Sequence, residues 1–214
     1  MPSVNSELVE VFKAKATSVN AVVQELPNMK AALQYIVDEC VKKAPCEMLA
    51  DEPGTEQGPL GPNKVPTRVE RIMAAPSLSD KDYQALEASC REKKIKLINS
   101  GLRKYLAGID MGVSIAELGI AASGTCMVNT DDEDVRLAGM VSEINVIILD
   151  KTEIYPDLPS ITEKLRARAN SQNATFTTLI TGPSRTADIE RVAAVGVHGP
   201  LQLHIILLEG KGNA

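Results

Sequence analysis

The sequence predicts an α/β fold built on one mostly parallel sheet. Short apolar, β-branched stretches alternate with helical patterns through the second half of the 214-residue chain. Two of these stretches, residues 146–149 and 201–208, are mainly apolar and are typical of buried strands. Hydrophobic residues make up 44% of the chain, which is enough for one domain with a sizeable core.

The first 44 residues predict a helical N-terminal arm. Residues 4–26 place apolar side chains at three- and four-residue spacings, as in an amphipathic helix. Pro27 interrupts this pattern, and Asn28 can cap a second helix that ends before Pro45. Such an arm either covers a face of its own sheet, which is the commoner outcome, or meets a partner chain.

A long loop is predicted next. Residues 51–67 contain four prolines and three glycines, a composition that excludes a helix or a central strand. Loops of this length are either disordered or functional lids. After it, Ser79 fits a capping box that opens a helix through Cys90, and residues 95–98 predict a short strand.

Residues 112–130 predict a helical fragment, a turn and a strand that begins at Cys126. The small residues of the turn, including Gly124 and Thr125, allow the backbone to come close to a ligand or to another turn. The acidic residues 131–134 predict a solvated turn. A buried strand at 146–149 and a helix at 161–169 then continue the alternation.

The candidate site lies in residues 175–208. They predict a strand at 175–180, a helix at 186–195 and a strand at 201–208, which together make one βαβ unit with parallel strands. The loop between the first strand and the helix lies at the carboxyl end of a strand, where the ligands of open parallel sheets bind.

This first loop has the chemistry of an anion site. Gly182 supplies a turn, Ser184 or Thr186 can cap the helix, and the free amides of its first turn would hold a phosphate or carboxylate. Arg185 could hold the same anion through two hydrogen bonds. Asp188 favours the helix N-terminus electrostatically. The alternative is a well-capped helix with a surface arginine.

His198, in the second loop, is one of only two histidines in the chain. Flanking glycines indicate that the backbone approaches something closely. In an ideal βαβ unit, however, this loop lies at the opposite end of the sheet from the first. A functional His198 therefore requires that the loop fold back, or that it complete the site of a neighbouring subunit in a homo-oligomer. His204, inside the last strand, is predicted to be a core histidine whose ring nitrogens are satisfied locally.

Composition excludes several classes of protein. The net charge of −5 argues against nucleic acid as a general partner. No apolar run approaches the roughly 18 residues that span a bilayer, and the N-terminus lacks the order of a signal peptide, so a cytoplasmic location is expected. The four cysteines form no C-x-x-C pair, so neither a metal site nor an iron–sulfur cluster is expected on this chain.

Several motifs resemble one family. TGPSRTADIE at 181–190 and GVHGP at 196–200, followed by the LHIILL strand, closely resemble the signature end of the lactate utilization protein C family (LutC/YkgG, the LUD domain). IAASGT at 120–125, Arg136 and SEINVIIL at 142–149 match the family more loosely.

The resemblance implies a fold like that of the sugar-phosphate isomerase and CoA-transferase superfamily (NagB/RpiA/CoA-transferase-like), with a Rossmann-like sheet and helices on both faces. It also implies a role in the oxidation of L-lactate to pyruvate beside partner proteins, one of which bears iron–sulfur clusters. The bound ligand would be a small anionic metabolite at residues 182–186.

The chain departs from the family at three positions. Ala122 stands where the family often has Glu, Ser123 replaces Thr, and Asn145 stands where a His is common. Any acid–base work would then fall on His198 or Glu117. Two alternatives remain open: a self-sufficient enzyme acting on a CoA ester or sugar phosphate, and an assembly or regulatory protein that docks partners through its N-terminal helices.

Overall fold

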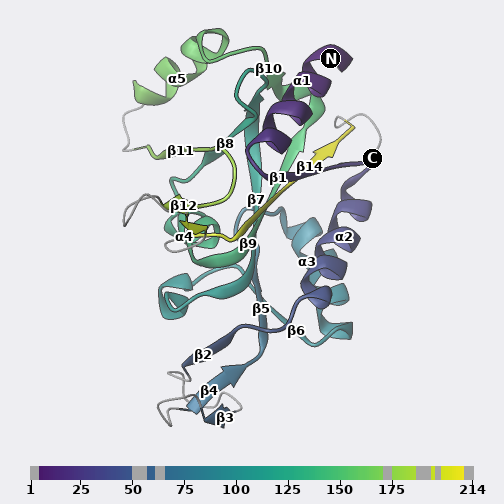
Figure 1. Cartoon of the computed structure of the whole chain (residues 1–214), viewed down its shortest axis with the longest axis vertical. Coiled ribbons are helices and arrows are strands. Elements are labelled where there is room, and N and C mark those ends of the chain that lie inside the picture. Colours follow the sequence, from purple (N-terminus) through teal and green to yellow (C-terminus); the bar gives the residue numbers. More distant parts are fainter. Residues whose placement is uncertain are drawn as a thin grey trace.

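The computed structural model describes residues 5–49, 57–60, 66–170, 175–186, 194–195 and 199–209. Strands run in the order β1-β14-β9-β7-β5-β6 across the main sheet of this described part (Figure 1), and every neighbouring pair along that order is parallel. The bounds are β1 (Ala21–Leu26), β14 (Gln202–Leu208), β9 (Ser142–Asp150), β7 (Ile109–Ile120), β5 (Arg71–Ala74) and β6 (Ile95–Ile98). The predicted mostly parallel α/β sheet is confirmed.

Helices cover both faces of this sheet. On one face, α2 (Met29–Lys42) and α3 (Asp80–Glu92) pack against Val146 and Ile148 of β9. On the other face, α1 (Ser6–Ser18) and α4 (Glu133–Val141) pack against a cluster that contains Ile147. Alternate residues of this buried strand thus face different helices, which is why residues 146–149 are all apolar.

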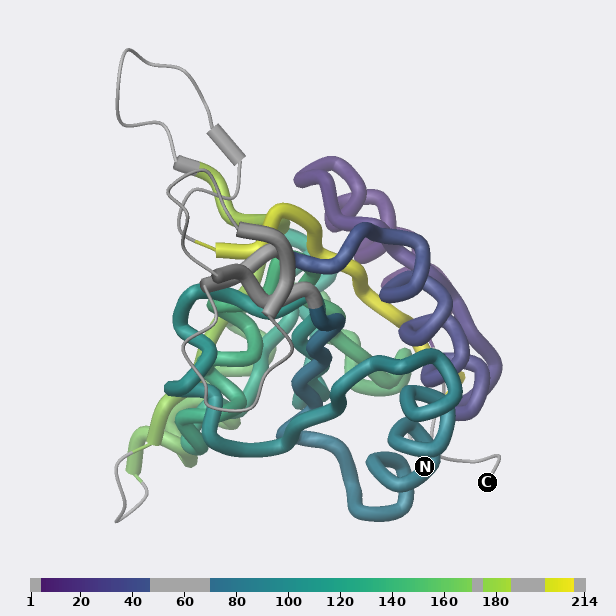
Figure 2. The backbone as a smooth tube through the Cα atoms, turned by 90° about the horizontal axis from the view of Figure 1, so that it is seen from below, coloured from purple at the N-terminus to yellow at the C-terminus, as the bar shows by residue number. Residues whose placement is uncertain are grey.

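The predicted N-terminal helix is wrong in its second half, because residues 21–26 form the edge strand β1. The helix ends at Ser18, and Asn20 then adopts a left-handed backbone (φ 68°) that turns the chain into the sheet. The β-branched Val22 and Val23 favour a strand, although their spacing also fits a helix. In Figure 2 this purple-to-blue segment runs along one side of the molecule, beside the yellow β14.

Both N-terminal helices cover their own sheet. The apolar face of α1 is buried at Val9, Phe12 and Ala16, and that of α2 is buried around Ile36. As predicted, Asn28 caps α2, accepting a hydrogen bond of 2.9 Å from the amide of Ala31. The apolar faces of these two helices are therefore buried in the chain itself and are not available to dock a partner.

A small antiparallel sheet lies at one end of the main sheet (Figure 1, bottom), with the order β2-β4-β3. Its strands are β2 (Glu47–Leu49), β4 (Pro66–Val69) and β3 (Gln57–Leu60). The prediction of one long loop over 51–67 is therefore wrong for residues 57–60 and 66–67. Proline is tolerated there because β3 is an edge strand and Pro66 begins β4. Residues 51–56 and 61–65 lie outside the described residues.

The strand β7 belongs to two pairings. Residues 109–115 pair with β9, and residues 116–120 pair antiparallel with β8 (Thr125–Asn129). The helical fragment predicted after Gly112 is therefore wrong. The strand is buried on both faces over most of its length, so its apolar spacing does not show a strand period.

The predicted βαβ unit is also wrong. The strand β11 (Thr177–Ile180) pairs antiparallel with β8 and not with β14. Residues 185–186 (β12) pair antiparallel with residues 194–195 (β13), so both ends of the predicted 186–195 helix are strand. Residues 187–193 lie outside the described residues.

The Ser79 cap of α3 and the strands predicted at 95–98 and 146–149 are confirmed, and the strand predicted at 201–208 is β14. The predicted helix at 161–169 is α5 (Thr162–Ala169). The remaining elements are β10 (Ile154–Tyr155) and the short 3-10 turns η1 (Leu102–Tyr105), η2 (Lys151–Glu153) and η3 (Pro159–Ile161).

Candidate ligand site

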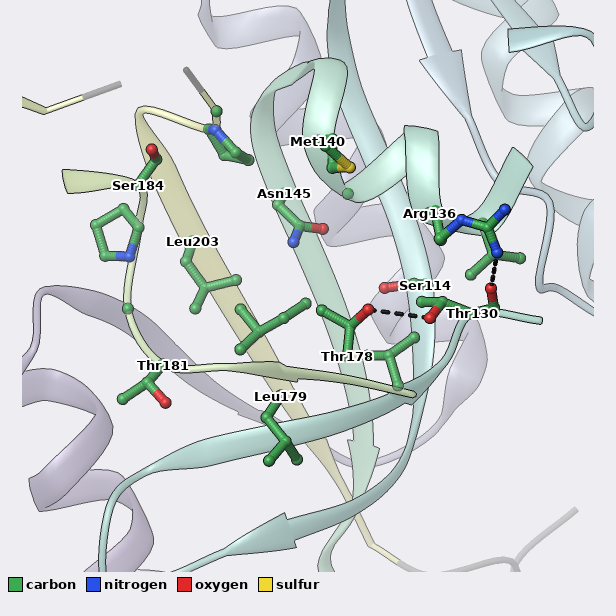
Figure 3. Close-up of a pocket in the computed structure, with 18 residues that line it drawn as sticks. Ser114, Thr130, Arg136, Met140, Asn145, Thr178, Leu179, Thr181, Ser184 and Leu203 are labelled. Carbon is green, nitrogen blue, oxygen red and sulfur yellow. Dashed lines mark hydrogen bonds between the residues drawn. The ribbon is translucent and has the colours of Figure 1, made fainter. Parts of the chain in front are cut away.

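A cavity of about 310 Å³ lies on the sheet face that α1 and α4 cover (Figure 3). The sheet strands β7, β9 and β14 form its floor, α4 forms one wall, and β8 with β11 forms another. Residues 181–184 and 199–200 close the remaining side. The cavity is therefore bounded by both loops that the sequence analysis singled out.

The floor carries two buried polar side chains. Asn145 of β9 is 2% exposed and Ser114 of β7 is 3% exposed. The Oδ1 atom of Asn145 is buried and has no hydrogen-bond partner among the described residues. In the sheet register, Asn145 lies between Gly112 of β7 and Leu203 of β14.

Glycines bring α4 close to the floor. A Cβ atom at Gly112 would lie 2.0 Å from the carbonyl oxygen of Ala138, so this glycine permits direct contact of β7 with α4. Gly139 faces the asparagine, because a Cβ atom there would lie 3.7 Å from the Nδ2 atom of Asn145. No side chain at Gly139 therefore covers the amide from the α4 side.

The α4 helix is anchored at its first turn. Asp132 caps it, accepting a hydrogen bond of 2.7 Å from the amide of Asp134. The carboxylate of Asp134 in turn accepts hydrogen bonds from the amides of Gly101 (3.0 Å) and Leu102 (2.8 Å). The predicted solvated turn at 131–134 is thus the start of a helix that is tied to η1.

Arg136 of α4 is the only charged residue among the described residues that line the cavity. Its Nη1 atom donates to the carbonyl oxygen of Thr130, and its guanidinium lies over the ring of Phe176, 4.6 Å from the centroid. Figure 3 shows the guanidinium turned toward Thr130 at the edge of the cavity. The interior is therefore uncharged and mostly apolar, with a few polar groups.

The two signature loops meet beside the cavity. The amide of Ser184 donates to the carbonyl oxygen of Pro200 at 3.0 Å. Gly182 has a left-handed φ of +72°, and a Cβ atom there would lie 2.5 Å from the carbonyl oxygen of Val19, so glycine is required. The loops come together because β11 pairs with β8. In an ideal βαβ unit β11 would instead lie parallel to β14. Gly182, Ser184 and Gly199 all line the cavity.

The predicted anion-binding cation does not line the cavity. The Nη2 atom of Arg185 donates to the carbonyl oxygen of Val19 at 2.8 Å, and its side chain is exposed. Thr186 pairs as a strand residue with Ala194, so no helix begins there. Asp188 and His198 lie outside the described residues, and their roles stay predictions.

The other predicted residues lie apart from the cavity or serve packing. Gly124 has φ +65°, and a Cβ atom there would lie 2.3 Å from the amide nitrogen of Ala16, so it admits α1. Thr125 is 5% exposed, and its hydroxyl bonds that of Thr181 at 2.7 Å. Glu117 pairs with Arg168 at 3.0 Å and is not among the described lining residues. A ligand role for these residues stays a prediction.

A second polar cluster lies at the amino ends of β7 and β9. Asp110, which is fully buried, accepts hydrogen bonds from Lys43 (2.6 Å) and from the amides of Cys46 (2.9 Å) and Ile72 (2.8 Å). Burial, then the Glu143 carboxylate, raises the pKa of the Cys46 thiol to about 12. This thiol is thus protonated at neutral pH. No group of three or more His, Cys, Asp or Glu side chains in the described part of the chain is placed to hold a metal ion.

Sequence reasoning did not propose Asn145 as a site residue, although it noted the position as a departure from the family pattern. The available signal was a single amide inside an otherwise apolar strand, INVIIL. A pattern cannot tell whether a buried amide is satisfied by the protein or left for a ligand.

Within the described residues, no helix is long and apolar enough to cross a membrane.

Comparisons with known proteins identify the family. The LUD domain matches residues 9–208. The chain is 36% identical over 101 residues to the uncharacterized protein YkgG of Escherichia coli, covering 46% of this chain and 44% of that protein. It is 31% identical over 104 residues to lactate utilization protein C of Macrococcus caseolyticus, covering 48% of this chain and 45% of that protein. The chain thus spans under half the length of either relative.

A solved structure has a similar fold. A DUF162 family protein from Deinococcus radiodurans superposes with a TM-score of 0.56 at 11% identity, covering 95% of this chain and 97% of that one. At that identity the likeness concerns the fold alone. The LUD match over nearly the whole chain, with LutC and YkgG proteins among its relatives, shows that this chain belongs to the LUD domain family.

Proposed function

We propose that this chain is a LutC-like subunit in the oxidation of L-lactate to pyruvate, that it acts beside an iron–sulfur partner protein, and that it binds a small organic acid in the cavity beside α4. The family and the names of its relatives support the pathway. One observation carries the ligand part: the cavity has a floor with a buried asparagine oxygen that no described residue satisfies.

The cavity suits a small metabolite. Its volume of about 310 Å³ is at the lower end of typical ligand pockets. Ser114 carries a hydroxyl group on the floor, and hydroxyl and amide donors can hold a carboxylate. Arg136 adds a positive charge at the edge. In this proposal Arg136 replaces Arg185 as the cation, because Arg136 lines the cavity and Arg185 is bonded to the Val19 carbonyl.

The pathway is tested in the organism that carries the gene. We expect that a tagged chain, purified from cells grown on L-lactate, brings an iron–sulfur protein with it, and that disruption of the gene prevents growth on L-lactate. Normal growth without the gene, together with the absence of such a partner, would contradict the pathway. Turnover of L-lactate by the isolated chain would instead identify a self-sufficient enzyme.

The ligand site is tested by equilibrium binding of L-lactate to the purified chain. We expect Arg136→Gln to weaken binding by about 1.5–3 kcal/mol, the scale of a hydrogen bond to a charged group. Arg185→Gln is the matched control, and its affinity should be unchanged. Weakening by Arg185→Gln alone would return the site to the 182–186 loop that the sequence predicted.

A further inference from the structure

We propose that Asn145 recognises the hydroxyl group of the bound acid, so that the cavity selects a 2-hydroxy acid over the corresponding 2-oxo acid. This inference rests on the proposed ligand site and makes its specificity explicit. A buried acceptor without a donor destabilises the folded protein that contains it.

The described neighbours of Asn145 do not supply the donor that its Oδ1 atom lacks. Asn145 is 2% exposed, so bulk water does not surround its side chain. Its partners in the sheet register are Gly112 and Leu203, and the residue facing it from α4 is Gly139. None of these three side chains can donate a hydrogen bond. Figure 3 shows the amide of Asn145 within the cavity, among the lining residues.

The amide distinguishes the two ligand classes by hydrogen bonding. A 2-hydroxy acid carries an O–H donor beside its carboxylate, so its hydroxyl can donate to Oδ1 while Nδ2 donates to a carboxylate oxygen. A 2-oxo acid has only an acceptor at the same position, which would face the Oδ1 acceptor and leave both oxygens unpaired. Sites built to bond a ligand hydroxyl reject analogues that lack it far more strongly than apolar sites reject a missing methylene.

The test compares three probes by calorimetry on the whole chain: L-lactate, pyruvate and propionate, which has neither oxygen at its second carbon. We expect L-lactate to bind at least about tenfold more tightly than either analogue, the factor that one unpaired buried group produces. In Asn145→Leu the three affinities should lie within about twofold of one another. Asn145→Ala, which adds no bulk, is the second variant in case leucine obstructs the cavity.

Ser142→Ala is the matched control. The Ser142 hydroxyl is also buried without a partner among the described residues, but it does not line the cavity, so its removal should preserve the preference for L-lactate. Failure of all three probes to bind the wild-type chain would overturn the proposed ligand site and this inference with it. Binding of L-lactate and pyruvate with equal affinity, or tighter binding of pyruvate, would overturn the inference alone. A preference that persists in both Asn145 variants would do the same.

Discussion

Two buried polar side chains on neighbouring strands of the sheet have opposite fates. His204 of β14 is paired in register with Val146, one residue from Asn145 of β9, and the two side chains face opposite sides of the sheet. The His204 ring bonds the Tyr35 hydroxyl at 2.9 Å and the Gln202 amide oxygen at 3.1 Å. Asn145 Oδ1 bonds no described residue. The chain supplies both partners of the histidine ring, whereas the asparagine whose oxygen has no partner lines the cavity.

The largest effect on stability is expected at His204, whose ring has two hydrogen-bond partners. His204→Phe should lower the free energy of unfolding by about 1–3 kcal/mol, because the chain loses the two hydrogen bonds that His204 makes with Tyr35 and Gln202, each worth roughly 0.5–1.5 kcal/mol. Urea denaturation measures this change. Tyr35→Phe, which removes one of the two hydrogen bonds, should cost less. Equal stability of wild type and His204→Phe would contradict the comparison.

The same histidine should make stability depend on pH. Burial lowers the pKa of His204, and nearby Lys42 lowers it further while Glu39 opposes the change. The unfolded chain then binds the proton more readily than the folded chain, so this contribution is complete above pH of about 6.5 and is lost as the pH falls toward the folded pKa. His204→Phe should flatten the slope of stability against pH in that range. Parallel slopes would exclude His204 as its source.

For Asn145, whose oxygen has no partner, the change in stability should have the opposite sign. Asn145→Leu removes a buried acceptor that has no partner, so the stability of the unliganded protein should stay equal or rise by roughly 1 kcal/mol. Thermal unfolding in the absence of ligand measures it. A marked loss of stability would show that the amide is structurally satisfied, and the contrast with His204 would disappear.

The smallest effect is expected at the residue that faces Asn145. Gly139→Ala should stabilise α4 by about 0.5–1 kcal/mol, because alanine is a better helix former and its Cβ would meet only Asn145 Nδ2, at 3.7 Å. The added methyl group also narrows access to the amide, so L-lactate binding should weaken several-fold. A gain in stability with unchanged binding would place the ligand elsewhere in the cavity.

Local signals were predictable from sequence and non-local pairings were not. The caps at Asn28 and Ser79 and the apolar strand at 146–149 depend on adjacent residues, and all are confirmed. The antiparallel pairing of β11 with β8 depends on residues about 50 positions apart, which no local pattern encodes. The apolar spacing of residues 186–195 fits a helix, but the chain pairs its ends as strands.

In the predicted 182–186 loop, glycine was the clearest signal, because it marks a turn that only glycine adopts easily. Gly182 needs its left-handed turn, and both it and Ser184 line the cavity as part of the predicted loop. Arg185 looked like an anion partner because its neighbours suggested a helix start that the structure does not contain. The environment of Asn145 is set by Gly112 and Leu203, which are distant in sequence, and by Gly139 on the preceding helix.

The shift of register in β7 between Ala116 and Leu118 has a consequence for the shape of the cavity. It lies where β7 stops pairing with β9 and begins to pair with β8. The same strand therefore contributes to the floor of the cavity and carries the β8–β11 wall. Such irregularities bend and twist a strand. The angle between the floor of the cavity and this wall therefore depends on the main chain at residues 116–118, which do not line the cavity.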